Sequence, residues 1–131
     1  VTSVFTGWRL RGGVSISAND QARIGQLMLD RGRIHSPTGP RQLIPADWIE
    51  RMQQPCALAR FYGMLVWLNP GASTFPGASE RSLFMVGAGG NYVWIEPTHQ
   101  AVIVVRWIDS AHLGEFMRRI TAALQQSGDT P

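Results

Sequence analysis

Apolar residues recur with a helical period in two stretches of the chain. Residues 18–31 carry an apolar stripe, and Ser17 before them can accept a hydrogen bond from the amide three residues on, which predicts a capped helix. Residues 111–125 place apolar side chains on one face and predict a closing helix. Pro45 suits a first helical position, so we also expect a short helix over 46–53.

Runs rich in β-forming residues follow in the second half of the chain. They predict strands at 61–68, 82–87, 91–96 and 101–107. Short connections join the last three, so we expect antiparallel pairing. The final run is apolar at every position from 101 to 105, which predicts a strand inside a sheet that is covered on both faces.

The remaining segments are rich in glycine, proline and polar residues. We expect a loop over 34–44, a long surface loop over 69–79 and a frayed tail over 127–131. Residues 1–16 are expected to be irregular to extended, with a break at Gly12-Gly13.

These elements predict one α+β domain of 131 residues. Its antiparallel sheet has about four strands, with the C-terminal helix packed on one face and two helices elsewhere. So small a sheet has edges that tend to pair with other strands unless something covers them, which points to a partner outside the chain.

Composition narrows the function classes. Hydrophobic residues make up 44% of the chain and charged residues 16%, which excludes a disordered tail. All 12 basic residues are arginines, and they are scattered among acids, so we expect no nucleic-acid partner. Because the chain has no lysine, it cannot itself supply a catalytic Lys.

Metal, cofactor and membrane roles find little support in the sequence. His35, His99 and His112 lie far apart and are expected at the solvated surface, and Cys56 is the one cysteine, so we expect no metal site and no cofactor. No apolar run is long enough for a membrane span, and compartment stays open. Because Val1 is not a translation start, we expect a processed, cloned or cut piece.

Three glycines, Gly87, Gly89 and Gly90, lie between two predicted strands. They predict either a tight turn or a wall that a ligand can touch closely. No helix follows them, so a phosphate-binding loop is a poor fit. Residue types alone offer no pair of nucleophile and base.

Four segments carry motifs in a specific order. They are Gly12-Gly13-Val14-Ser15-Ile16-Ser17-Ala18-Asn19-Asp20-Gln21-Ala22-Arg23-Ile24-Gly25-Gln26-Leu27, Leu43-Ile44-Pro45-Ala46-Asp47-Trp48-Ile49, Tyr62-Gly63-Met64-Leu65-Val66-Trp67, and Gly87-Ala88-Gly89-Gly90-Asn91-Tyr92-Val93-Trp94-Ile95-Glu96-Pro97 with its continuation to Val105. Together they resemble the serine β-lactamase and penicillin-binding-protein-like hydrolases, in the branch of class C-like esterases and 6-aminohexanoate-dimer hydrolases.

The resemblance implies the C-terminal part of a β-lactamase/transpeptidase-like fold. In such hydrolases the nucleophilic Ser and its Lys lie in Ser-x-x-Lys, and a Tyr base follows in a second motif. Both precede the segment seen here. The implied partner is therefore the missing N-terminal half of the same domain, or a second chain that carries it.

The resemblance also implies site residues. The third family motif aligns with Met85-Val86-Gly87, where the cationic residue common in the family is absent. The backbone N–H of Ala88 would be one of two oxyanion-hole donors. The implied substrate-binding wall consists of Met85, Val86, Gly87, Gly89, Gly90 and Asn91.

Three hypotheses follow. The chain supplies the oxyanion-hole strand of a serine hydrolase that acts on an ester, amide or lactam, and it is inactive alone. Alternatively, it is a non-catalytic binding or structural module that keeps the fold. The third hypothesis is a self-contained domain with unrelated ligand binding, which predicts a stable, soluble monomer without a large apolar face.

Overall fold

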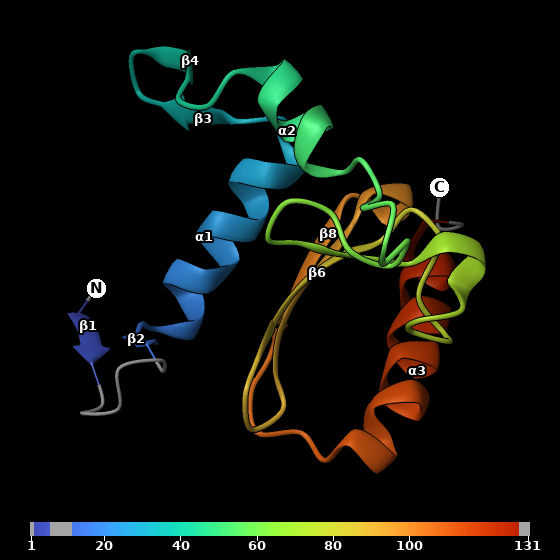
Figure 1. Ribbon diagram of the computed structural model, residues 1–131. Coiled ribbons are helices and arrows are strands. Elements are labelled where there is room, and N and C mark those ends of the chain that lie inside the picture. The colour runs from blue at the N-terminus through green and yellow to red at the C-terminus, as the bar shows by residue number, and fades with distance from the viewer. Residues whose placement is uncertain (1, 6–11, 129–131) are drawn as a thin grey trace.

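A four-stranded antiparallel sheet lies at the centre of the molecule (Figure 1). The computed structural model describes residues 2–5 and 12–128. Neighbouring strands in the sheet follow the order β5 (Trp67–Leu68), β6 (Leu83–Gly87), β7 (Asn91–Glu96) and β8 (Ala101–Val105). The fold is α+β, and the predicted strand number and antiparallel pairing are confirmed.

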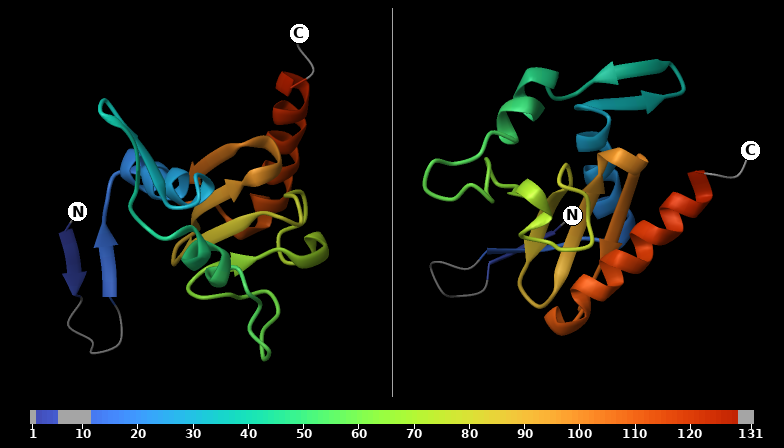
Figure 2. Two further views of the ribbon diagram at one scale, coloured as in Figure 1. Left: turned by 90° about the horizontal axis from the view of Figure 1, so that it is seen from above. Right: turned by 90° about the vertical axis from the view of Figure 1, so that its right-hand side faces the viewer.

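Helices cover both faces of this sheet (Figure 2). α1 (Ala18–Leu29) packs on one face against β7 and β8, and α3 (Ser110–Gly128) lies on the other. The Ser17 hydroxyl accepts a hydrogen bond from the Asp20 amide at 3.1 Å, so the predicted cap is confirmed. A Cβ on Gly25 would lie 2.5 Å from Val102 Cγ1, so glycine lets α1 approach the sheet closely.

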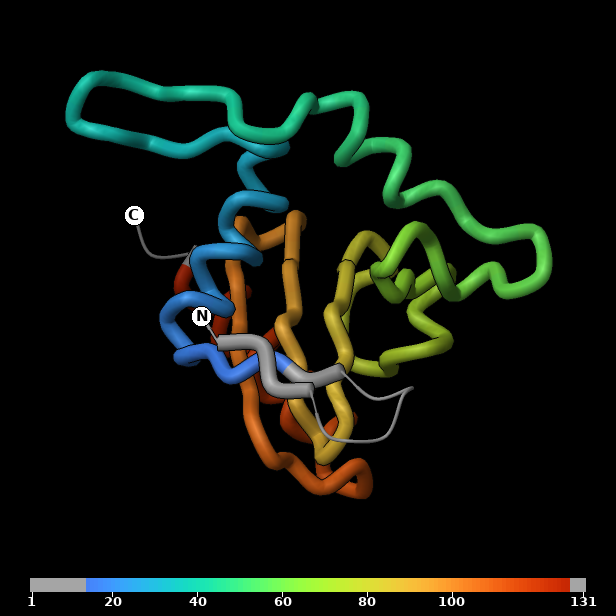
Figure 3. Tube along the Cα trace, turned by 60° about the vertical axis from the view of Figure 1, so that its left-hand side comes forward, coloured from blue at the N-terminus to red at the C-terminus, as the bar shows by residue number. Residues whose placement is uncertain are grey.

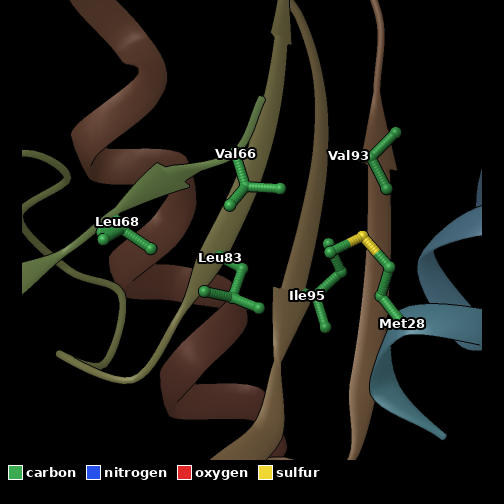
Figure 4. Close-up of a cluster of buried hydrophobic side chains, with 6 residues drawn as sticks. All are labelled: Met28, Val66, Leu68, Leu83, Val93 and Ile95. Carbon is green, nitrogen blue, oxygen red and sulfur yellow. The ribbon is translucent and has the colours of Figure 1, made fainter. Parts of the chain in front are cut away.

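Each face of the sheet has its own hydrophobic cluster. The cluster on the α1 side contains Met28, Val66, Leu68, Leu83, Val93 and Ile95 (Figure 4). The cluster on the α3 side contains Phe75, Ala78, Phe84, Trp94 and Met117. Alternate residues of β6 and β7 therefore enter opposite clusters, as expected for strands buried on both faces.

A small hairpin projects from the sheet, and a short helix follows it in the chain. The segment predicted as a loop over 34–44 instead forms the hairpin of β3 (Arg33–Ser36) and β4 (Gly39–Gln42), which extends away from the sheet (Figure 3). The loop prediction is wrong because only Pro37 lies in the two-residue turn, whereas Gly39 and Pro40 are paired residues of β4. α2 (Ala46–Met52) follows it and confirms the predicted short helix.

The predictions for the two ends of the chain are only partly correct. β1 (Thr2–Phe5) pairs with β2 (Gly12–Ser15), so Gly12 and Gly13 lie within a strand and the predicted break is wrong. α3 continues through Gly128, so fraying from residue 127 is wrong for its first two residues. The rest of that tail, 129–131, lies outside the described residues.

The strand predicted over 61–68 is mostly wrong, because only Trp67–Leu68 pairs as a strand. The Gly63 N–H donates to the Val66 carbonyl at 2.9 Å, and Leu65 has φ +61°. These contacts bend the apolar run into a turn before it enters the sheet.

Two burial predictions also need correction. β8 is covered on both faces, but it is the end strand, not an interior one, since an apolar run reports covered faces and carries no information about the edge. The segment 69–79, which includes the short 3₁₀ helix η1 (Pro70–Ala72), is not wholly a surface loop. Its Asn69 side chain is buried and makes five hydrogen bonds to backbone groups of Thr74, Phe75, Ala78 and Ser79.

Among the described residues, no helix is long and apolar enough to cross a membrane.

Candidate functional site

The β6–β7 hairpin turns through Ala88, Gly89 and Gly90, between the paired residues Gly87 and Asn91. Gly89 has φ +82° and Gly90 has φ +77°, a region that residues with a side chain rarely adopt. A Cβ on Gly90 would lie 2.0 Å from the Ile108 carbonyl oxygen, and a Cβ on Gly89 would meet the Trp107 ring. These two glycines therefore make the turn and let the protein's own chain approach it.

Gly87 differs from the other two glycines. Its φ lies outside the left-handed region, and an added Cβ would make only ordinary contacts, the nearest 3.4 Å from Asn91 Cβ. The fold therefore gives no steric reason for glycine at this position. Glycine within a strand weakens it and often marks a site where a ligand or another backbone approaches closely.

The edge of β6 beside Gly87 lacks a strand partner. β5 pairs only with Leu83 and Phe84, so Met85, Val86 and Gly87 have no neighbour on that side among the described strands. Val86 and Gly87 are exposed, and Met85 is half-buried against the α1-side cluster. A backbone edge of three residues therefore has no strand partner among the described residues.

A hollow of about 260 Å³ lies where this edge meets the start of α1. Met85, Val86, Gly87 and Asn91 line it from the hairpin, and Ile16, Gln21 and Ile24 line it from the helix side. Two buried amide oxygens, Gln21 Oε1 and Asn91 Oδ1, accept no hydrogen bond from the described residues. The hollow is therefore mainly apolar, and the two unpartnered amide oxygens lie buried in residues of its wall.

The remaining predicted residues lie beside the hollow. Ala88 is exposed, and its carbonyl accepts a hydrogen bond from Asn91 Nδ2 at 2.7 Å, which orders the turn. The structure thus brings Met85, Val86, Gly87 and Asn91 together around one hollow. It places Ala88, Gly89 and Gly90 in the adjoining turn.

Sequence reasoning missed a buried polar network at the other end of β7. We call Ser79, Ser82, Trp94, Glu96 and Thr98 the Glu96 network. The fully buried Glu96 carboxylate accepts from the Ser82 hydroxyl at 2.6 Å and from the Ser79 hydroxyl at 2.7 Å. It also accepts from the backbone N–H groups of Thr98 at 3.0 Å and Ser79 at 3.2 Å.

These contacts determine the charge state of Glu96. Burial acts to raise the pKa of this carboxyl, but the hydrogen bonds from Ser82 and Ser79 and from the two backbone amides outweigh burial and lower it. All four donors hold the carboxylate in place, which indicates a structural role. Two serines three residues apart, before a strand that ends in a lone Glu, are the sequence signal that was available.

The remaining candidates for reactive or metal-binding side chains are the histidines and the cysteine. His35 and His112 are exposed as predicted, whereas His99 is only 17% exposed and its Nδ1 lies 3.9 Å from Glu96 Oε1, so its predicted surface position is wrong. His99 belongs to the 3₁₀ helix η2 (Pro97–His99), which turns it toward the carboxylate. Cys56 is an exposed free thiol. The described part of the chain contains no group of three or more metal-ligating side chains.

No protein-family model matches this chain, and no curated protein sequence matches it.

Proposed function

We propose that this chain is the C-terminal part of a β-lactamase-like serine hydrolase. The observation that carries the proposal is the open edge at Met85–Gly87, where a glycine without a steric role lies next to a turn and a hollow. The order of the four sequence motifs supports the same assignment. In this role the chain supplies the substrate-cleft wall and the oxyanion-hole strand.

The chemistry follows from the exposed backbone of the turn. A serine of the missing part attacks the carbonyl of an ester, amide or lactam, and negative charge develops on the carbonyl oxygen. The Ala88 N–H stabilises that charge, a contribution of about 3–4 kcal/mol for one such donor. Water then hydrolyses the acyl-enzyme. No cation accompanies Met85 and Val86, so a substrate carboxylate finds no ion pair on this strand.

The partner in this proposal carries the nucleophile, its Lys and the Tyr base. Two edges without a strand partner among the described residues support an incomplete sheet: the Met85–Gly87 part of β6 and the outer edge of β8, a strand of five apolar residues. Large apolar side chains are also exposed, among them Leu58 at 97% and Leu65 at 82%. The unpaired strand edges are the feature that pairing with another part of the protein would cover.

A non-catalytic binding module is the second candidate. The absence of a cation from Met85-Val86-Gly87 favours it, because many serine hydrolases of the resembled family keep a charged residue there. The same hollow would then bind a small ligand without turning it over. Activity of the completed protein distinguishes the two candidates.

The test measures p-nitrophenyl ester hydrolysis by the polypeptide that joins this chain to the segment with Ser-x-x-Lys. We expect turnover by that polypeptide and none by the 131 residues alone. Ala88→Pro removes the N–H and should lower kcat by about 100- to 1,000-fold, whereas Ala88→Ser keeps the N–H and should retain activity. Equal activity of the two folded variants would contradict the assignment of Ala88, and turnover by the 131 residues alone would overturn the proposal.

A further inference from the structure

A second concave site lies at the opposite end of the sheet from the hairpin turn. It is an open crevice of about 640 Å³ between α2, the end of α1 and the sheet. Five apolar side chains form its floor: Met28, Leu68 and Leu83 are 5–7% exposed, and Ile49 and Ile95 are almost fully buried. Four of these side chains belong to the α1-side cluster shown in Figure 4. The volume lies in the range that small-molecule sites occupy.

The rim of the crevice is charged. Arg31 already pairs with Glu50, so neither is available to a ligand without breaking that contact. Arg60 and Arg81 form no ion pair with any described residue, and the nearby Glu80 likewise has none. The unpaired rim groups therefore leave one net positive charge beside an apolar floor.

The buried polar side chains of the crevice, Asn69 and Ser82, already use their polar groups in internal hydrogen bonds. The amide of Asn69 is used by five internal hydrogen bonds. The Ser82 hydroxyl donates to Glu96 and accepts from Trp94 Nε1. The crevice thus combines an apolar floor with a rim that includes Arg60 and Arg81, and guanidinium groups bind carboxylates through two parallel hydrogen bonds.

From this combination we propose that the crevice binds a small amphipathic carboxylate, with its apolar tail on the floor and its carboxylate at Arg60 and Arg81. The site is separate from the hydrolase site proposed above. The crevice lies at the Leu83–Ile95 pair and the hollow at the Gly87–Asn91 pair, four residues or roughly 13 Å along the strands. Either proposal can therefore be refuted without affecting the other.

Isothermal titration of octanoate into the 131-residue chain tests the proposal. We expect saturable binding of one octanoate, weakened about 10-fold or more in the double variant Arg60→Gln/Arg81→Gln. Arg33→Gln removes an exposed arginine outside the crevice and is the matched control, which should bind like the original chain.

Octan-1-ol separates the contribution of charge from that of the floor. It should bind the original chain and the double variant equally, because it has no carboxylate. Urea unfolding verifies that the exposed substitutions leave the fold intact. Absence of saturable octanoate binding, or equal octanoate affinity of the double variant and the original chain, would overturn the proposal.

Discussion

Ser82→Ala is the most informative single substitution in the core. Ser82 is 1% exposed, and its hydroxyl has two strong hydrogen-bond partners. It donates to Glu96 Oε2 at 2.6 Å and accepts from Trp94 Nε1 at 3.0 Å. Alanine removes a single oxygen and leaves the packing volume nearly unchanged, so the effect reports hydrogen bonding alone.

The magnitude follows from the two lost partners. A hydrogen bond to a charged group contributes about 1.5–3 kcal/mol, and a buried donor left unsatisfied costs about 1–3 kcal/mol. Because both consequences arise at Ser82, we expect the free energy of unfolding to fall by about 3–5 kcal/mol. That is a large share of the roughly 5–15 kcal/mol that keeps a domain folded.

Urea unfolding monitored by circular dichroism measures this change. With a slope typical of small proteins, the midpoint should decrease by roughly 2 M. Ser73→Ala is the matched control, because that hydroxyl is exposed and bonds only to the Pro70 carbonyl at 2.8 Å. It should change stability by less than about 0.5 kcal/mol. A loss below about 1 kcal/mol in Ser82→Ala would refute the energetic role assigned to the Glu96 network.

Three further predictions concern stability. Because the fold lowers the pKa of Glu96, the stabilisation that its carboxylate contributes is complete above the unfolded pKa of about 4.3 and is lost as the pH falls toward the folded value. In an acid titration of stability, the variant Glu96→Gln should lack this pH-dependent contribution. Gly90→Ala should destabilise by about 2 kcal/mol or more in urea, whereas Gly87→Ala should be nearly neutral; equal losses would contradict the account of the turn. Asn69→Ala should lower the melting temperature by about 10 °C.

The sequence predicted the regular parts of the fold because local periodicity and capping agree there. Residues 18–29 and 110–128 each show an apolar helical face, and Ser17 gives the first helix its start. The β6–β7 hairpin was predictable since β-forming residues flank two glycines that the turn needs.

The remaining elements depend on contacts that are distant in sequence. The apolar run 61–66 bends because the Met64 N–H donates to the Met52 carbonyl and Leu65 adopts a positive φ, and neither feature is visible in the run itself. The edge position of β8 likewise depends on which other strands are present.

The candidate site was predicted in part. The resemblance singled out residues 85–91, but the participation of Gln21 requires the packing of α1 beside the hairpin. The Glu96 network was missed because its serines and its carboxylate come together only when β6 pairs with β7. Polar groups that meet across strands leave only a weak local pattern.

Fluorophosphonate labelling with peptide mapping tests the central claim most directly. The claim is that this chain forms half of a site whose nucleophile lies elsewhere. We predict no label on the 131 residues alone, and in the polypeptide that includes the Ser-x-x-Lys segment we predict one labelled serine, outside these residues. Labelling of any serine within this chain, or no labelling of the completed polypeptide, would contradict the account.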